Sequence, residues 1–195
     1  MNPDIAVLID KIHTLEAELE AALAMRSAEL RVGLEKGRAV FEEEVLRRHR
    51  ELKIRLSRYV LNASPLVILT APFIYAVIVP LLGLDLFVTV YQAVCFPVYG
   101  IPKVRRRDYL VLDRHHLAYL NAMEKLNCAY CAYANGLISY AREIASRTEQ
   151  YWCPIKHARR VIGAHPRYAL FEDYGDADGY RKWLEQFDRS KRKGS

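Results

Sequence analysis

The sequence predicts an all-α fold in which an integral membrane helical hairpin joins an N-terminal helical arm to a C-terminal helical domain. Residues 65–102 are almost entirely apolar, and Asp85 is their only charged residue. Apolar side chains before this stretch recur at helical spacing, and the residues after it contain no long alternating apolar–polar run. The expected boundaries are 1–63 for the arm, 64–102 for the hairpin and 103–195 for the C-terminal domain.

The apolar stretch is too long for one crossing of a bilayer. A continuous helix of this length would measure about 57 Å, roughly twice the hydrocarbon thickness of ~30 Å. Two short spans fit, with a turn at Gly83-Leu84-Asp85. Five prolines in and around the stretch also suit a hairpin that enters and leaves the same leaflet. A buried soluble core is the third alternative.

Basic residues flank the stretch on both sides and predict its orientation. Arg47-Arg48-His49-Arg50 comes before it, and residues 103–107 (KVRRR) follow it. Short basic flanks stay in the cytoplasm, which predicts a multi-pass protein of the cytoplasmic membrane with both termini cytoplasmic. Residues 103–195 contain 18 basic and 11 acidic residues, a net charge of +7. Anionic lipid headgroups account for this charge. The sequence has no basic stripe interleaved with aromatic residues, so we expect no nucleic-acid partner.

The arm carries apolar residues at the a and d spacing of a coiled coil. They are Ile5, Leu8, Ile12, Leu15, Leu19 and Ala22. A second amphipathic stretch, with Gly33 and Gly37 on or near its apolar face, predicts that the helix continues toward the membrane. The arm either packs on the C-terminal domain or joins a second copy or a protein partner as a coiled coil.

The C-terminal residues predict several amphipathic helices. Asp108 is suited to cap the first helix, and Asn135-Gly136 predicts its end. A second helix is expected over 137–152 and a short third over 155–163. The last helix is expected near 179–189.

Three cysteines and a histidine have spacings typical of a zinc site. Cys128 and Cys131 form C-x2-C, and Cys153 with His157 forms C-x3-H. Three interpretations stay open: a structural zinc ion or, less favoured, an iron–sulfur cluster; a redox-active dithiol; or small buried residues that bind nothing. An unbroken helix over 137–152 would carry Cys153 away from the C-x2-C pair. A four-ligand site therefore requires that helix to be shorter or bent.

Two other polar patterns are weaker. Asp113 and His116, with Glu124 and Glu143, resemble half of a carboxylate-bridged di-iron set. Residues 174–185 resemble an incomplete calcium loop, for which a turn capped by Asp178 is the simpler interpretation. No motif for nucleophilic catalysis or phosphate binding is present in the sequence, so enzymatic activity stays an open question.

Residues 127–136 (NCAYCAYANG) and 149–158 (EQYWCPIKHA) resemble a group of small bacterial membrane proteins. The resemblance covers about residues 96–180. It implies a bacterial cytoplasmic membrane and no activity. We therefore expect a membrane-tethered interaction or scaffold protein with a Cys3His-stapled domain. The alternative is a redox or metal-dependent membrane enzyme acting on a lipophilic substrate such as a quinone.

Overall fold

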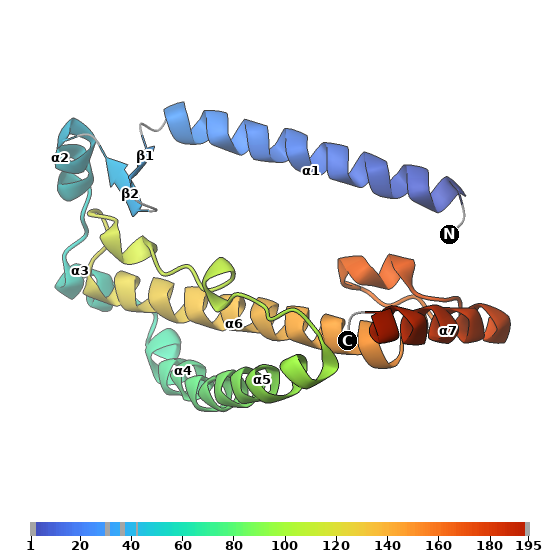
Figure 1. The fold of residues 1–195 in the computed structure, drawn as a ribbon. Helices are drawn as coiled ribbons and strands as arrows, with labels where there is room; N and C mark the ends of the chain where they lie inside the picture. Colours follow the sequence, from blue (N-terminus) through green and yellow to red (C-terminus); the bar gives the residue numbers. More distant parts are fainter. Residues whose placement is uncertain (1–2, 30–31, 36–37, 42, 194–195) are drawn as a thin grey trace. The chain divides into compact units, whose positions relative to one another are not determined.

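The computed structural model describes residues 3–29, 32–35, 38–41 and 43–193. The chain divides into two units, Met1–Leu81 with Leu110–Gly136 and Leu82–Tyr109 with Leu137–Ser195. Helices α5 and α6 each begin in the first unit and end in the second. In chain order the elements are α1 (Pro3–Glu29), β1 (Val32–Glu35), β2 (Arg38–Phe41), α2 (Glu43–Glu51), α3 (Leu56–Leu61), α4 (Pro65–Ala76), α5 (Ile78–Tyr99), η1 (Arg106–Asp108), η2 (Arg114–His116), α6 (Ala122–Trp152), η3 (Pro166–Leu170) and α7 (Ala177–Lys193) (Figure 1). The described elements are helical, as predicted, except for the short β-hairpin formed by β1 and β2.

The hairpin interrupts the arm where the sequence predicted a continuing helix. Strands β1 and β2 pair antiparallel, with Val32 opposite Phe41 and Glu35 opposite Arg38. The helix prediction is therefore wrong over residues 32–35 and 38–41. Two glycines within five residues, Gly33 and Gly37, each disfavour a helix by about 1 kcal/mol. The helical pattern resumes only with α2.

The apolar stretch contains no turn at Gly83-Leu84-Asp85, so that prediction is wrong. All three residues lie inside α5, and the only interruption falls at Val77, between α4 and α5. Pro80 explains its position. A proline has no N–H for the carbonyl four residues earlier and clashes with it, and for Pro80 this carbonyl belongs to Ala76, the last residue of α4.

Helix α6 is one continuous helix of 31 residues. It begins at Ala122, not at Asp108, because Asn121 and Glu124 form a reciprocal capping box: the Glu124 N–H donates to Asn121 Oδ1 at 3.0 Å, and the Asn121 N–H donates to Glu124 Oε2 at 2.8 Å. The predicted stop at Asn135-Gly136 is also wrong. Leu137 directly follows it and is fully buried, so packing outweighs the cost of about 1 kcal/mol for glycine in a helix.

The core of the second unit lies along α6. Its most buried apolar side chains are Phe96, Val104, Leu137, Tyr140, Ile144 and Phe171. Residues 155–163, predicted as a short helix, contain none; instead Ile155 forms an isolated parallel bridge with Glu172. The last helix, α7, is longer than predicted, and Asp176 rather than Asp178 caps it by accepting the Gly179 N–H at 2.8 Å.

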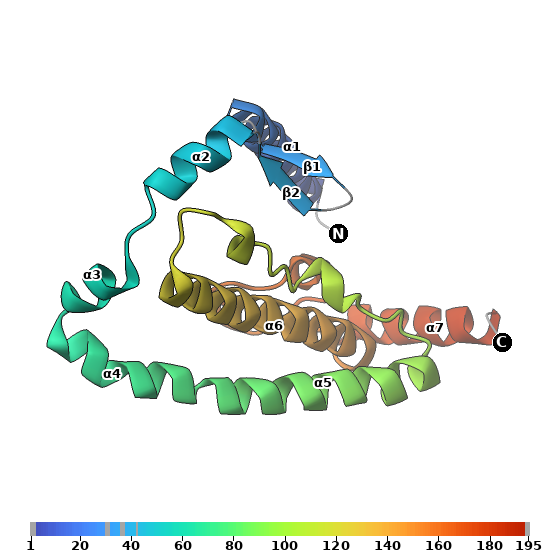
Figure 2. The same ribbon diagram turned by 90° about the vertical axis from the view of Figure 1, so that its left-hand side faces the viewer.

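Within each unit, part of α6 lies beside part of the α4–α5 segment (Figure 2). In the first unit the rings of Tyr75 and Tyr130 meet edge to face at 5.7 Å. In the second unit Tyr99 packs against Tyr151 and Trp152 at 5.1 and 5.4 Å. Each unit therefore covers one side of this apolar segment with residues of α6.

Candidate functional site

The α4–α5 segment exposes large apolar side chains over much of its surface. Within the described residues, Pro65–Tyr99 is the helical segment that is long and apolar enough to cross a membrane, judged by length and composition. We call its exposed large side chains the apolar face. They are Leu66, Val67, Ile68, Leu69, Phe73, Ile74, Val77, Val79, Leu82, Leu84, Leu86, Phe87, Val90, Val94 and Val98. Their exposed fractions run from 38% to 77%, where a water-soluble protein would bury most of them.

The hydroxyl groups beside the apolar face are satisfied within the segment. Thr70 donates to the carbonyl of Leu66 at 3.0 Å, and Thr89 donates to Asp85 Oδ1 at 3.3 Å. A hydroxyl that is hydrogen-bonded in this way enters an apolar environment at much lower cost than a free one. The face is therefore compatible with hydrocarbon along its length.

The opposite side of α5 is polar. Asp85 pairs with Arg106 at 2.5 Å, and the carboxylate side chain is only 16% exposed. Gln92 is buried; it donates to the Tyr140 hydroxyl at 2.7 Å and accepts the Val104 N–H at 2.5 Å. Because of these bonds, residues 104–106 run antiparallel to α5 and alongside it. Arg106 therefore lies next to Asp85, near the middle of α5.

The first unit shows the same arrangement on α4. The Tyr75 hydroxyl donates to Asn127 Oδ1, and the Tyr130 hydroxyl donates to the carbonyl of Ile74 at 2.7 Å. Asn127 and Tyr130 both belong to α6. Each unit thus has an apolar outer side and a hydrogen-bonded inner side.

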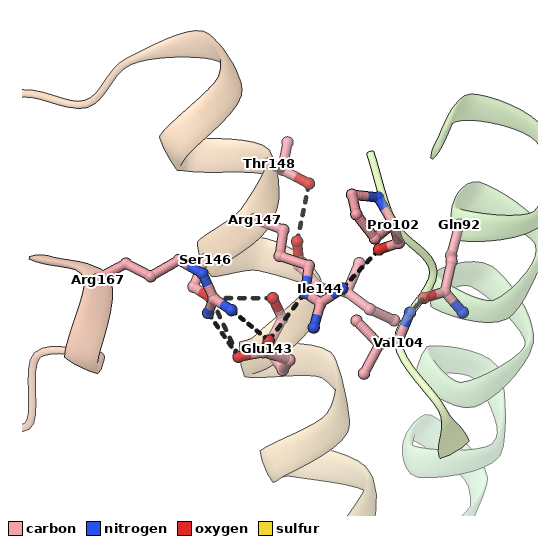
Figure 3. Close-up of polar contacts among 9 residues, drawn as sticks. All are labelled: Gln92, Pro102, Val104, Glu143, Ile144, Ser146, Arg147, Thr148 and Arg167. Carbon is pink, nitrogen blue, oxygen red and sulfur yellow. Dashed lines mark hydrogen bonds and ion pairs between the residues drawn. The ribbon is translucent and has the colours of Figure 1, made fainter. Parts of the chain in front are cut away.

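A buried ionic cluster fixes the second half of α6. Glu143 accepts two hydrogen bonds from Arg167, both at 2.7 Å, and one from Arg147 Nε at 2.8 Å. Arg147 also donates to the carbonyl of Pro102 at 2.6 Å (Figure 3). Burial alone would raise the pKa of Glu143, but the hydrogen bonds and charges of Arg167 and Arg147 outweigh it and hold this pKa below its ordinary value. The cluster joins α6 both to η3 and to the segment after α5.

The four predicted zinc ligands are divided between the two units, with Cys128 and Cys131 in the first and Cys153 and His157 in the second. Cys128 and Cys131 lie on α6, and Cys153 follows its last residue. The 22 residues from Cys131 to Cys153 correspond to about 33 Å of helix. The condition that the sequence set, a shorter or bent helix, is not met. All four cysteines are free thiols, with Cys131 and Cys153 exposed.

His157, the fourth predicted ligand, makes other contacts. Its Nδ1 lies 3.1 Å from the Tyr168 hydroxyl, which also accepts the His157 N–H at 2.6 Å. Among the described residues, no three His, Cys, Asp or Glu side chains are grouped so as to hold a metal ion. The zinc and iron–sulfur interpretations stay predictions from spacing.

The half di-iron pattern is not assembled either. His116 belongs to the short turn η2, whereas Glu124 caps α6 and Glu143 is held by two arginines. His115 and His116 contact each other, with ring centroids 3.8 Å apart. Glu124 and Glu143 therefore have partners other than a metal ion.

Comparison of the chain with protein-family models, with curated proteins and with solved structures found no match.

Sequence reasoning missed the polar side of α5. Asp85 was identified from the sequence because it is the only charged residue of the apolar stretch. Gln92, which is uncharged, was not identified. The signal was their spacing: seven residues place Asp85 and Gln92 on the same side of a helix. Glu143 and Arg167 are 24 residues apart, and no local pattern announces their pairing.

Proposed function

We propose that this protein is a membrane-attached interaction or scaffold protein. The observation that carries the proposal is the apolar face, fifteen large side chains that are exposed along one segment. Exposed basic residues adjoin it, among them Arg58 before the segment and Lys103, Arg105 and Arg107 after it. An apolar surface bordered by basic residues is suited to a membrane with anionic lipids.

Cell fractionation of the full-length protein tests membrane attachment. We expect the wild type in the membrane pellet and the triple variant Phe73→Glu/Phe87→Glu/Val94→Glu in the supernatant. Each of these side chains contributes about 1.5–3 kcal/mol when buried, so removing three lowers the partition into membranes about a thousandfold or more. The matched control is Ile138→Glu on α6, at a side chain that is 55% exposed and outside the apolar face. A wild type that stays in the supernatant would refute the proposal.

The arm is the proposed interaction device. Every side chain of α1 from Val7 to Glu29 is exposed except that of Ile9, which is half-buried. The a and d residues Leu8, Leu15 and Leu19 are 57%, 63% and 59% exposed. In a parallel dimer with this register, Lys11 at a g position would face Glu16 at an e position of the second copy, a favourable pair.

Light scattering of the detergent-solubilised full-length protein tests this role. The wild type is expected as a dimer and Leu15→Glu/Leu19→Glu as a monomer, while Glu18→Gln, an exposed change off the seam, leaves the dimer intact. A monomeric wild type that captures no partner through α1 would contradict the role of the arm.

The metal staple predicted from the sequence is a separate proposal with its own test. One zinc ion per purified chain, lost in Cys128→Ser/Cys131→Ser, would support a Cys3His-stapled scaffold. Iron with visible absorbance would instead support the alternative, a redox enzyme acting on a lipophilic substrate such as a quinone. A chain purified without either metal would rule out both metal assignments.

A further inference from the structure

The polar side of α5 determines how this helix meets the membrane, given that the protein is membrane-attached as proposed above. Asp85 lies eight residues into the 22-residue α5 and pairs with Arg106. Arg106 belongs to residues 103–107, a basic run whose charged members are all exposed. If α5 crossed the bilayer, this pair would carry the run toward the hydrocarbon interior, where charged side chains are strongly disfavoured.

Contacts farther along α5 lead to the same conclusion. Gln92 is bonded to Tyr140 of α6, and the Tyr91 hydroxyl lies 3.1 Å from the Thr148 hydroxyl. The same half of α6 carries the Glu143 ionic cluster and the exposed Arg142. A membrane-crossing α5 would therefore draw a charged helix into the bilayer beside it.

The outer side of α5 has no such polar partners. Phe87, Val90, Val94 and Val98 follow one another at helical spacing of three or four residues and are 51–77% exposed. This stripe lies on the side of α5 away from Asp85 and Gln92. One side of α5 is therefore apolar, and the other side is covered by polar residues of α6 and of the segment after α5. Helices that lie in a membrane interface have this two-sided character.

We propose that α5 lies in the plane of one leaflet, with its exposed apolar side chains in the acyl chains and the second half of α6 on the water side. The occupant of the face is the surface of a bilayer containing anionic lipids. Charge complementarity supports this choice, because Lys103, Arg105 and Arg107 are exposed next to α5, at the level expected for headgroups. In this arrangement α5 does not cross the bilayer. The segments before and after it therefore stay on the same side of the membrane.

Depth measurements at three matched positions test the orientation. Val79, Phe87 and Val98 all lie on α5 and are 69%, 74% and 77% exposed, so a fluorescent non-canonical amino acid at each one leaves packing intact. The labelled full-length protein is bound to vesicles of 70% phosphatidylcholine and 30% phosphatidylglycerol. The phosphatidylcholine is brominated either near the headgroup end or near the terminal end of the acyl chain.

An in-plane segment gives the same quenching preference at all three positions, with the bromine near the headgroup more effective. In a straight crossing helix, the 11 residues from Phe87 to Val98 differ in depth by about 16 Å. Quenching that shifts to the deep bromine at Phe87 while Val98 keeps the shallow preference would overturn the in-plane proposal and leave membrane attachment standing. No quenching at any position would refute the attachment itself and the orientation with it. A probe at Ile138, on α6, serves as the control and should not be quenched.

Discussion

Removing the carboxylate of Glu143 should destabilise the second unit strongly. Glu143→Ala leaves Arg167 and Arg147 without the acceptor of three hydrogen bonds of 2.7–2.8 Å, and their side chains are only 27% and 23% exposed. Breaking a fully buried ion pair from one side costs about 3–5 kcal/mol, and these three side chains are only partly buried. Because Arg147 also keeps its bond to the Pro102 carbonyl, we expect a cost at the lower end of this range, about 3 kcal/mol, for Glu143→Ala.

A double-mutant cycle isolates this interaction. The free energy of unfolding is measured by denaturant titration in mild detergent for the wild type, Glu143→Ala, Arg167→Ala and the double variant. The double variant should be only slightly less stable than either single one, which gives a coupling energy of about 2–3 kcal/mol. The matched control is Glu149→Gln on the same helix, whose side chain is 34% exposed and pairs with His165, and it should cost about 1 kcal/mol or less.

The pH dependence gives a second readout. The pKa of Glu143 in the folded protein lies below its ordinary value, so the pair contributes fully above the unfolded pKa of about 4.3. Its contribution is lost as the pH falls through the folded pKa. The stability gap between the wild type and Glu143→Gln should therefore be constant near neutral pH and narrow only in acid. Strictly additive costs, or a gap that widens in acid, would refute the assignment of Glu143 as the ionised centre of the cluster.

Three further predictions concern α5 and α6. Gln92→Leu should lower the free energy of unfolding by about 1–3 kcal/mol, because the buried Val104 N–H loses its acceptor, and denaturant titration should show this loss without a change in membrane binding. Asn121→Ala should cost about 1 kcal/mol and increase amide hydrogen exchange in the first turn of α6, whereas Asn121→Asp, which keeps the cap, should not. Vesicle binding should weaken as salt rises on anionic vesicles but not on neutral ones, and Lys103→Gln/Arg105→Gln should reduce this salt dependence; a dependence equal to that of the wild type would exclude these residues from lipid contact.

Composition and local periodicity were enough to locate the apolar segment and the helices that flank it. The sequence placed the segment at residues 65–102, and the structure has helices over Pro65–Ala76 and Ile78–Tyr99. The turn predicted at Gly83-Leu84-Asp85 is wrong because a glycine beside a charged residue resembles a turn in the sequence. In the structure Gly83 is helical and Asp85 has Arg106 as a partner 21 residues away. A long-range ion pair of this kind has no local signature.

Both ends of the first predicted C-terminal helix differ from α6, for different reasons. Its start was readable, since Asn121 followed by Glu124 is a capping box, and Asp108 was preferred only because it comes first after the basic run. Its continuation through Gly136 was not readable, because it depends on the burial of Leu137 and Tyr140 against other parts of the chain. The candidate zinc site stays a prediction from spacing, because Cys128 and Cys131 belong to the first unit and Cys153 and His157 to the second.

Three prolines lie along the α4–α5 segment: Pro80 follows its one interruption, whereas Pro72 and Pro97 lie inside α4 and α5. Pro72, Pro80 and Pro97 are exposed, and none of them can donate to the carbonyl four residues earlier, which belongs to Ile68, Ala76 and Ala93 respectively. Each of these oxygens lacks its usual intrahelical donor, and in a membrane neighbouring groups or water must satisfy it. If α5 lies in one leaflet as proposed, water near the headgroups favours a shallow position, and a shallow wedge would expand the outer part of that monolayer more than its interior. Such a wedge favours curved membranes, so this protein is expected to concentrate where a bilayer bends.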